Sequence, residues 1–148
     1  MENKKIMICG SMSFAKEMLA LQNQLKAFGY EVSVPCDTEL HVEKPGFIDE
    51  LDKDREHLIK NNIMKKCFGI LAGSDSILFL NLPKNGVNGY IGTSSLMEMG
   101  LAYYLGKKIF LMYPYPDPNV YRWAHEVASF EPTVLNGSID FFQKTKVN

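Results

Sequence analysis

The stretch Lys5-Ile-Met-Ile-Cys-Gly10 is a short apolar run that ends in glycine. Such a run is typical of a strand buried on both faces of a parallel sheet. Apolar residues then recur at helical spacing over 14–28, and Gly29 stands where glycine commonly ends a helix. Residues 30–34 alternate between polar and apolar and stop at Pro35, which indicates a second strand. This N-terminal segment therefore predicts a strand–helix–strand unit with parallel strands.

The rest of the chain continues the alternation of apolar runs and helical patterns. Residues 36–53 are polar and include Pro45 and Gly46, so they predict a long mobile loop of the kind that is functional or disordered. Strands that alternate with helices favour a sheet of mostly parallel strands. We expect one α/β domain over residues 1–148, a Rossmann-like fold with five strands in the flavodoxin-like order 2-1-3-4-5 and helices on both faces. The further helices are expected over 54–70, 96–105, 121–130 and 139–145, and the further strands over 76–80, 108–112 and 133–135.

Composition excludes several classes of protein. The chain is 46% hydrophobic and 22% charged with a net charge of −1, which is ordinary for a globular protein. It has no block of Lys and Arg interleaved with aromatics, so we expect no nucleic-acid partner. No stretch approaches the roughly 20 apolar residues that cross a bilayer. Three cysteines without a C-x-x-C spacing indicate a reducing compartment, and the N-terminus does not resemble a signal peptide, so we expect a cytoplasmic protein.

A ligand site is expected where the winding of the sheet reverses. In this strand order the reversal lies between the first and third strands, at their carboxyl ends. Gly10 and Ser11 follow the first strand, and Asn81 follows the third. The glycine would let a ligand approach the backbone, whereas in the alternative interpretation the segment is a tight turn in which Ser11 or Ser13 caps a helix. The G-x-G-x-x-G fingerprint is absent, so the sequence does not support a dinucleotide site.

A second candidate segment enters the third helix. Gly92-Thr-Ser-Ser95 would offer free backbone N–H groups and hydroxyls, a natural site for a phosphate or another anion. Glu98 would lie in the first helical turn and face the same cleft. In the alternative interpretation, Ser95-Leu-Met-Glu98 is a capping box in which the glutamate only satisfies an orphan N–H group.

Metal and thiol chemistry have weaker support in the sequence. His41, His57 and His125 are scattered and show no ligand spacing, so we expect no metal and no cofactor. Cys9 and Cys67 are expected to be small buried hydrophobic residues.

Three segments together resemble the nucleoside 2-deoxyribosyltransferase family, which includes the deoxynucleoside 5′-monophosphate N-glycosidases. They are Ile8-Cys-Gly-Ser11, Asp75 before the third strand, and Met97-Glu-Met-Gly-Leu-Ala-Tyr-Tyr-Leu-Gly-Lys107. The most specific part is Glu-x-Gly-x-Ala-x-x-Leu-Gly-Lys, which begins at Glu98. The resemblance implies that Glu98 is the nucleophile of an N-glycosidase or deoxyribosyltransferase, and that water or a second base resolves a covalent glycosyl-enzyme.

The resemblance also implies a substrate and an assembly. The substrate would be a nucleoside or a nucleoside 5′-monophosphate, and the protein would form a homo-oligomer. Family members carry an aspartate in the helix before the third strand, where this chain has Cys67. That departure leaves open a second interpretation, a nucleotide-binding sensor module without catalysis. The residues expected to bind the substrate are Gly10, Ser11, Asn81, Asn88, Tyr90, Gly92, Thr93 and Ser94.

Overall fold

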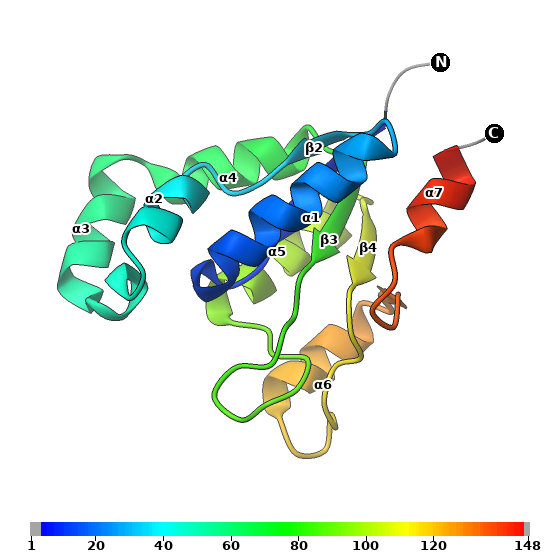
Figure 1. Ribbon diagram of the computed structural model, residues 1–148. Coiled ribbons are helices and arrows are strands. Elements are labelled where there is room, and N and C mark those ends of the chain that lie inside the picture. Colours follow the sequence, from blue (N-terminus) through cyan, green and yellow to red (C-terminus); the bar gives the residue numbers. More distant parts are fainter. Residues whose placement is uncertain (1–3, 147–148) are drawn as a thin grey trace.

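The protein, described here from a computed structural model, contains a sheet of five parallel strands (Figure 1). The structure describes residues 4–146, so the first three and last two residues of the predicted domain lie outside the described residues. The strand order is β2-β1-β3-β4-β5, which confirms the predicted α/β class and the predicted order. The strands are β1 (Lys5–Cys9), β2 (Glu31–Ser33), β3 (Ser76–Phe79), β4 (Lys108–Leu111) and β5 (Thr133–Val134).

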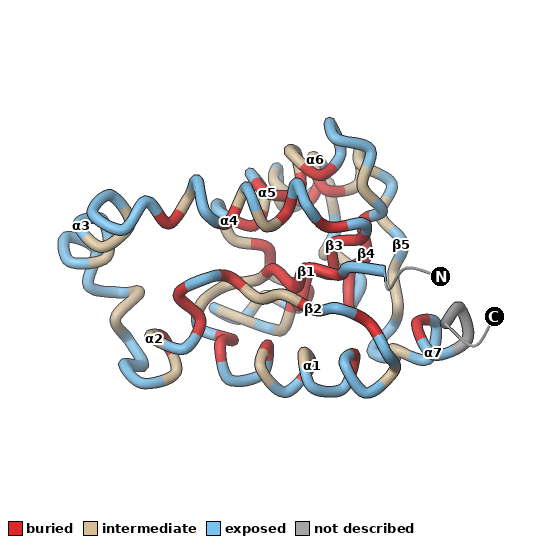
Figure 2. Tube along the Cα trace, turned by 90° about the horizontal axis from the view of Figure 1, so that it is seen from above, coloured by how far each residue is buried: buried red, intermediate tan, exposed pale blue. Residues whose placement is uncertain are grey.

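Helices connect the strands and cover both faces of the sheet. The α-helices are α1 (Ala15–Ala27), α2 (Thr38–Glu43), α3 (Leu51–Lys60), α4 (Ile63–Ala72), α5 (Thr93–Tyr104), α6 (Arg122–Ser129) and α7 (Asp140–Lys146). Two 3-10 turns, η1 (Met12–Phe14) and η2 (Phe47–Asp49), precede α1 and α3. Helices α1 and α7 lie on one face, and α4, α5 and α6 lie on the other (Figure 2).

Two apolar cores follow from the alternation of side chains along the strands. Ile6 and Ile8 of β1 pack with Leu78 and the apolar face of α1. Met7 and Cys9 point the other way and pack with α4 and α5. Because both faces of β1 and β3 are covered, the two strands are almost entirely buried, as their continuous apolar sequences predict.

The segment predicted as a long loop is instead largely helical. Within residues 36–53 the chain forms α2, η2 and the start of α3, so the loop prediction is wrong. These elements project beyond the sheet, at the left of Figure 1. None of the residues of α3 is buried, so an apolar stripe, the main sequence signal of a helix, is weak here.

The helix predicted over 54–70 is two helices. Asn62 adopts φ 54°, a left-handed conformation that breaks the chain between α3 and α4. Asparagine tolerates this conformation better than most residues because its short polar side chain bonds locally. The break gives α3 and α4 different directions, as Figure 1 shows.

No helix within residues 4–146 is both long and apolar enough to cross a membrane.

Two contacts fasten the loop after β3 to the loop after β4. The side-chain amide of Asn81 donates from Nδ2 to the carbonyl oxygen of Tyr113 over 2.7 Å, and its Oδ1 accepts from the Tyr113 N–H over 2.9 Å. Gly89, at φ +73°, packs so closely on the backbone that a Cβ there would overlap the carbonyl oxygen of Pro114. Only glycine fits this position, on grounds of both conformation and space.

We predict that Gly89→Ala destabilises the protein more than Gly86→Ala. Both residues have a similar positive φ, but a Cβ on Gly86 would meet nothing within 4 Å. Gly86→Ala should therefore lower the free energy of unfolding by about 1–2 kcal/mol, the cost of the left-handed conformation. Gly89→Ala adds the overlap with Pro114 and should cost about 3 kcal/mol or more. Urea unfolding of both variants measures the difference, and equal losses would contradict the close packing at Gly89.

Candidate functional site

A cavity of about 190 Å³ opens at the carboxyl ends of β1 and β3, the expected reversal point of the sheet. The segments after β1 and β2, helices α2 to α4, and the entry to α5 all contribute to its wall. Parts of the chain far apart in sequence therefore meet around one space. Of the predicted site residues, the wall contains Gly10, Ser11, Tyr90, Gly92, Thr93, Ser94 and Glu98.

Two predicted site residues lie elsewhere. Asn81 is buried, and its amide is engaged with the backbone of Tyr113 as described above. Asn88 is exposed and lines a separate hollow together with the proline- and tyrosine-rich segment after β4. Neither residue lines the cavity. Asn81 instead holds the ends of β3 and β4 together.

The sequence left two interpretations of the turn after β1, a ligand contact or a tight capping turn, and the structure shows a structural role. A Cβ on Gly10 would stand 3.0 Å from the carbonyl oxygen of Leu80, so glycine allows β1 and the chain after β3 to approach closely. Ser11 Oγ accepts a hydrogen bond from the N–H of Ser13 over 3.2 Å, so Ser11 caps the 3-10 turn η1 and not α1, whose N-cap residue is Phe14. The same Oγ accepts a hydrogen bond from Lys84 Nζ over 3.0 Å, which places a cation at the cavity wall.

Helix α5 begins earlier than predicted, and this changes the interpretation of Glu98. Gly92 is the N-cap residue and Thr93 the first helical residue, so Glu98 lies in the second turn. The prediction that Glu98 lies in the first turn is therefore wrong. The alternative, a capping box from Ser95 to Glu98, is also wrong, because Ser95 is not the N-cap residue. The first hydrogen bond runs from the Leu96 N–H to the Gly92 carbonyl over 2.9 Å. The N–H groups of residues 93–95 consequently lack a partner within the helix at the cavity wall.

Glu98 is the most perturbed carboxyl group of the cavity. Its residue is only 7% exposed, and within residues 4–146 it forms no ion pair. Burial raises its pKa from 4.5 to about 7, a hydrogen bond from Cys9 lowers it, and the charge of Asp37 raises it. The Cys9 thiol donates to Glu98 Oε2 over 3.5 Å, whereas Oε1 accepts no hydrogen bond from the described part of the chain. Oε1 is thus the oxygen left available to a ligand.

The two buried cysteines are neutral thiols. Burial, followed by the nearby Glu98, raises the pKa of Cys9 well above its usual range. Cys67 lines the cavity, and burial raises its pKa to about 12. Both residues pack in the apolar core beneath the cavity, as the sequence predicts. A neutral thiol at position 67 cannot supply the charge of the aspartate that the resemblance expects there.

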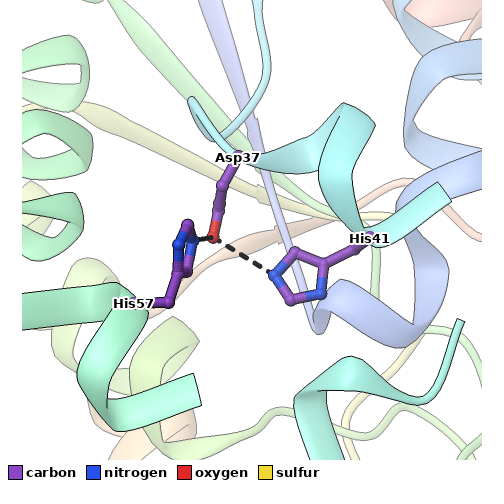
Figure 3. Close-up of side chains that lie close together, drawn as sticks. All are labelled: Asp37, His41 and His57. Atoms are coloured by element: carbon purple, nitrogen blue, oxygen red, sulfur yellow. Dashed lines mark hydrogen bonds and ion pairs between the residues drawn. The ribbon is translucent and has the colours of Figure 1, made fainter. Parts of the chain in front are cut away.

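A cluster of three polar side chains on the opposite wall was missed by sequence reasoning. Asp37 Oδ2 lies 3.2 Å from His41 Nε2 and 3.1 Å from His57 Nε2, so the carboxylate stands between the two rings (Figure 3). The expectation that the histidines are scattered is wrong for these two residues. His41 follows Asp37 by one helical turn, a spacing that could have suggested a pair. His57 comes from α3, and its approach depends on a fold of residues 37–60 that the sequence did not reveal.

Comparisons with models of protein families and with curated protein sequences find no match to this chain. A functional interpretation therefore depends on the side chains that surround the cavity. Among these, the buried Glu98 carboxyl, the Lys84 ammonium and the free amides of α5 combine a reactive group with groups that bind anions.

We predict that Glu98 makes the protein less stable as the pH rises from about 4.5 to about 7. The pKa of Glu98 is raised in the folded state, so the folded state holds this proton more tightly than the unfolded state does across that interval. The free energy of unfolding should fall by roughly 3 kcal/mol and then level off. Urea unfolding at a series of pH values, with Glu98→Gln as the reference, isolates the contribution. A difference between the two proteins that stays constant with pH would show that Glu98 has an ordinary pKa.

Proposed function

We propose that this protein cleaves or transfers the N-glycosidic bond of a nucleoside or nucleoside 5′-monophosphate, with Glu98 as the nucleophile. The observation that carries the proposal is the buried Glu98 carboxyl group at the cavity, with Oε2 bound by Cys9 and Oε1 unbound. The string from Glu98 to Lys107 that resembles the deoxyribosyltransferases gives it independent support.

The reaction would proceed in two displacements. In the first, Glu98 Oε1 attacks the anomeric carbon, the bond to the base nitrogen breaks with its electron pair, and the base leaves after protonation. In the second, water attacks the same carbon and releases the sugar and the glutamate, which gives hydrolysis. If a second base attacks instead of water, the result is transfer.

Burial of Glu98 suits the first displacement. A carboxylate with little water around it interacts strongly with the positive charge that develops on the sugar. The nucleophile must be deprotonated, and burial raises its pKa to about 7. Catalysis should therefore increase with pH across the neutral range until Glu98 is fully ionised.

Protonation of the leaving base requires an acid, and Asp54 supplies a second carboxyl group at the cavity wall. Burial raises the pKa of Asp54, whereas the nearby His41 and His57 lower it. Position 67 holds a neutral thiol, so Asp54 or a water molecule is a better source of this proton than Cys67.

The size of the cavity supports a small reacting fragment. Its volume of about 190 Å³ is below the roughly 300–1,000 Å³ of pockets that enclose a drug-sized ligand. A sugar ring could be enclosed while the rest of the nucleotide extends to the mouth. There Tyr90, whose ring lies 6.1 Å from that of Trp123, offers an aromatic surface for a base.

We predict that Glu98→Gln abolishes base release and leaves the fold intact. The substitution keeps the size of the side chain and removes its nucleophilic charge. Incubation with a panel of nucleosides and 5′-monophosphates, followed by chromatography of the free base, measures the activity. Glu17→Gln, at an exposed position in the first turn of α1, is the matched control and should keep full activity.

Each alternative has its own outcome in this assay. A Glu98→Gln variant as active as the wild type would eliminate Glu98 as nucleophile. A wild-type protein that binds nucleotides and releases no base from any member of the panel would favour the nucleotide-binding sensor over the enzyme.

We predict further that a 5′-monophosphate binds more tightly than the matched nucleoside. The unpaired amides of residues 93–95 and the N-terminus of α5 favour an anion by roughly 0.3–1 kcal/mol or more. Charge-assisted hydrogen bonds from Thr93, Ser94 and Lys84 would each add about 1.5–3 kcal/mol before the cost of dehydrating the phosphate. After the cost of dehydrating the phosphate is subtracted, we expect a net gain of about one to three orders of magnitude in affinity.

Calorimetric titration of a nucleoside and its monophosphate tests this preference. Lys84→Met, or Thr93→Ala combined with Ser94→Ala, should reduce the difference in affinity between the monophosphate and the nucleoside. Lys26→Met, at an exposed position in the last turn of α1, removes one positive charge away from the cavity and should not change it. Equal affinities in the wild-type protein would show that the entry to α5 does not bind phosphate.

A further inference from the structure

We propose that Asp37, His41 and His57 bind a divalent transition-metal ion of the zinc class at the wall of the cavity. A carboxylate and two imidazoles are ligands that Zn²⁺ commonly takes in sites with three protein ligands. The three potential ligand atoms, Asp37 Oδ2 and the Nε2 atoms of His41 and His57, all lie within 4.8 Å of one another. Figure 3 shows both rings directed at the carboxylate.

The distances agree with those of a coordination sphere. Ligand atoms about 2.0–2.2 Å from a zinc ion and at tetrahedral angles stand about 3.3–3.6 Å apart. Asp37 Oδ2 is 3.2 Å from His41 Nε2 and 3.1 Å from His57 Nε2. These two distances are within a few tenths of an ångström of that range, and the two Nε2 atoms lie within 4.8 Å of each other, so the rings can close around an ion.

The cluster is protected from water and yet borders the cavity. The side chains of His41 and Asp37 are 3% and 6% exposed, and that of His57 is 15% exposed. Asp37 and His41 also line the cavity. Three protein ligands leave a fourth position for water or for an oxygen of a substrate, the arrangement of catalytic zinc sites.

Asn61 lies beside His57 at the position where a histidine ligand needs outer support, with its amide nitrogen toward the ring. Its Nδ2 lies 3.0 Å from His57 Nδ1 and 3.2 Å from the His57 carbonyl oxygen. When His57 Nε2 binds a metal ion, Nδ1 carries the remaining ring proton and requires an acceptor. Rotation of the Asn61 amide would present Oδ1 to Nδ1, at the expense of the contact with the carbonyl oxygen.

The proposed ion goes beyond the proposed function and is independent of it. Glu98 is the nucleophile of the glycosyl chemistry, whereas the metal ligands come from the start of α2 and from α3. The sequence predicted no metal because the histidines showed no ligand spacing, and the fold brings two of them to one carboxylate.

Zinc affinity of the full-length protein tests the site. After treatment with a chelator, the protein is titrated with Zn²⁺ in competition with a chromophoric chelator, and Co²⁺ is bound in parallel so that its visible spectrum reports the ligands. We expect one ion per chain. Asp37→Asn and His57→Ala should each weaken binding by more than about 100-fold, since loss of a ligand exceeds the 10- to 100-fold effect of an outer-shell substitution.

Two control variants separate the site from other donors. His125→Ala removes an exposed histidine of α6 and should leave the affinity unchanged. Cys36→Ser removes the exposed thiol next to Asp37 and should also leave it unchanged. Circular dichroism and thermal unfolding of the metal-free variants establish that each one folds.

Three results would overturn the proposal: no zinc binding by the wild-type protein, binding that survives in both Asp37→Asn and His57→Ala, or binding that is lost in Cys36→Ser. Glu98→Gln should bind zinc as the wild type does. Base release without any metal binding would refute the metal site and leave the proposed function intact. Metal binding without base release would support the metal site and refute the proposed function.

Discussion

Residues Ile6–Cys9 of β1 pair in parallel with Ser76–Phe79 of β3, and the two chains then leave the sheet toward opposite faces. The chain after β1 enters η1 and α1 on one face, whereas the chain after β3 reaches α5 on the other (Figure 2). Their divergence opens the space that the cavity occupies. The pairing also brings Cys9, at the end of β1, against Glu98 of α5. Both the position of the site and the environment of its main carboxyl group therefore depend on this one pair of strands.

The cavity has walls of different character. On the α5 side, a helix N-terminus, Lys84 and the Ser11 hydroxyl favour anions. On the α2–α3 side, Asp37, His41 and Asp54 supply carboxylates and an imidazole. Glu98 of α5 also lines the cavity, and the negative charge of Asp37 contributes to its raised pKa. The cavity therefore combines groups that attract anions on one side with carboxylates on the other.

The sequence predicted the sheet well because β1, β3 and β4 are continuous apolar runs, and the runs are bounded by glycine, proline or polar residues. The strand order followed from the alternation of strands with helices. The start of α5 was misplaced by three residues because Gly92, and not Ser95, is the N-cap residue. The helices within residues 36–53 could not be predicted in the same way. Helix α3 buries no residue, and Asn62 separates it from α4 by a left-handed turn that leaves little trace in sequence patterns.

The site residues likewise form two groups, those whose position could be predicted from the sequence and those whose position could not. Glu98 and the entry to α5 follow a strongly apolar strand, so their place near the carboxyl ends of the strands could be inferred. The contact of Asp37 with His57 joins residues 20 positions apart through a polar segment. No periodicity encodes that contact. Asn81 was expected to bind a ligand because of its position, but its amide satisfies the backbone of Tyr113 instead.

The double hydrogen bond of Asn81 and the close approach of Gly89 to Pro114 fix the loop that leads to Tyr90 of the cavity wall, while α3, which lines another part of that wall, has no buried residue. Local opening costs the least free energy where few apolar contacts must be broken. A ligand too large for the resting cavity should therefore displace α3 more readily than it spreads the strands. Movement of α3 relative to α2 would also separate His57 from Asp37, because His57 belongs to α3 and Asp37 stands at the start of α2.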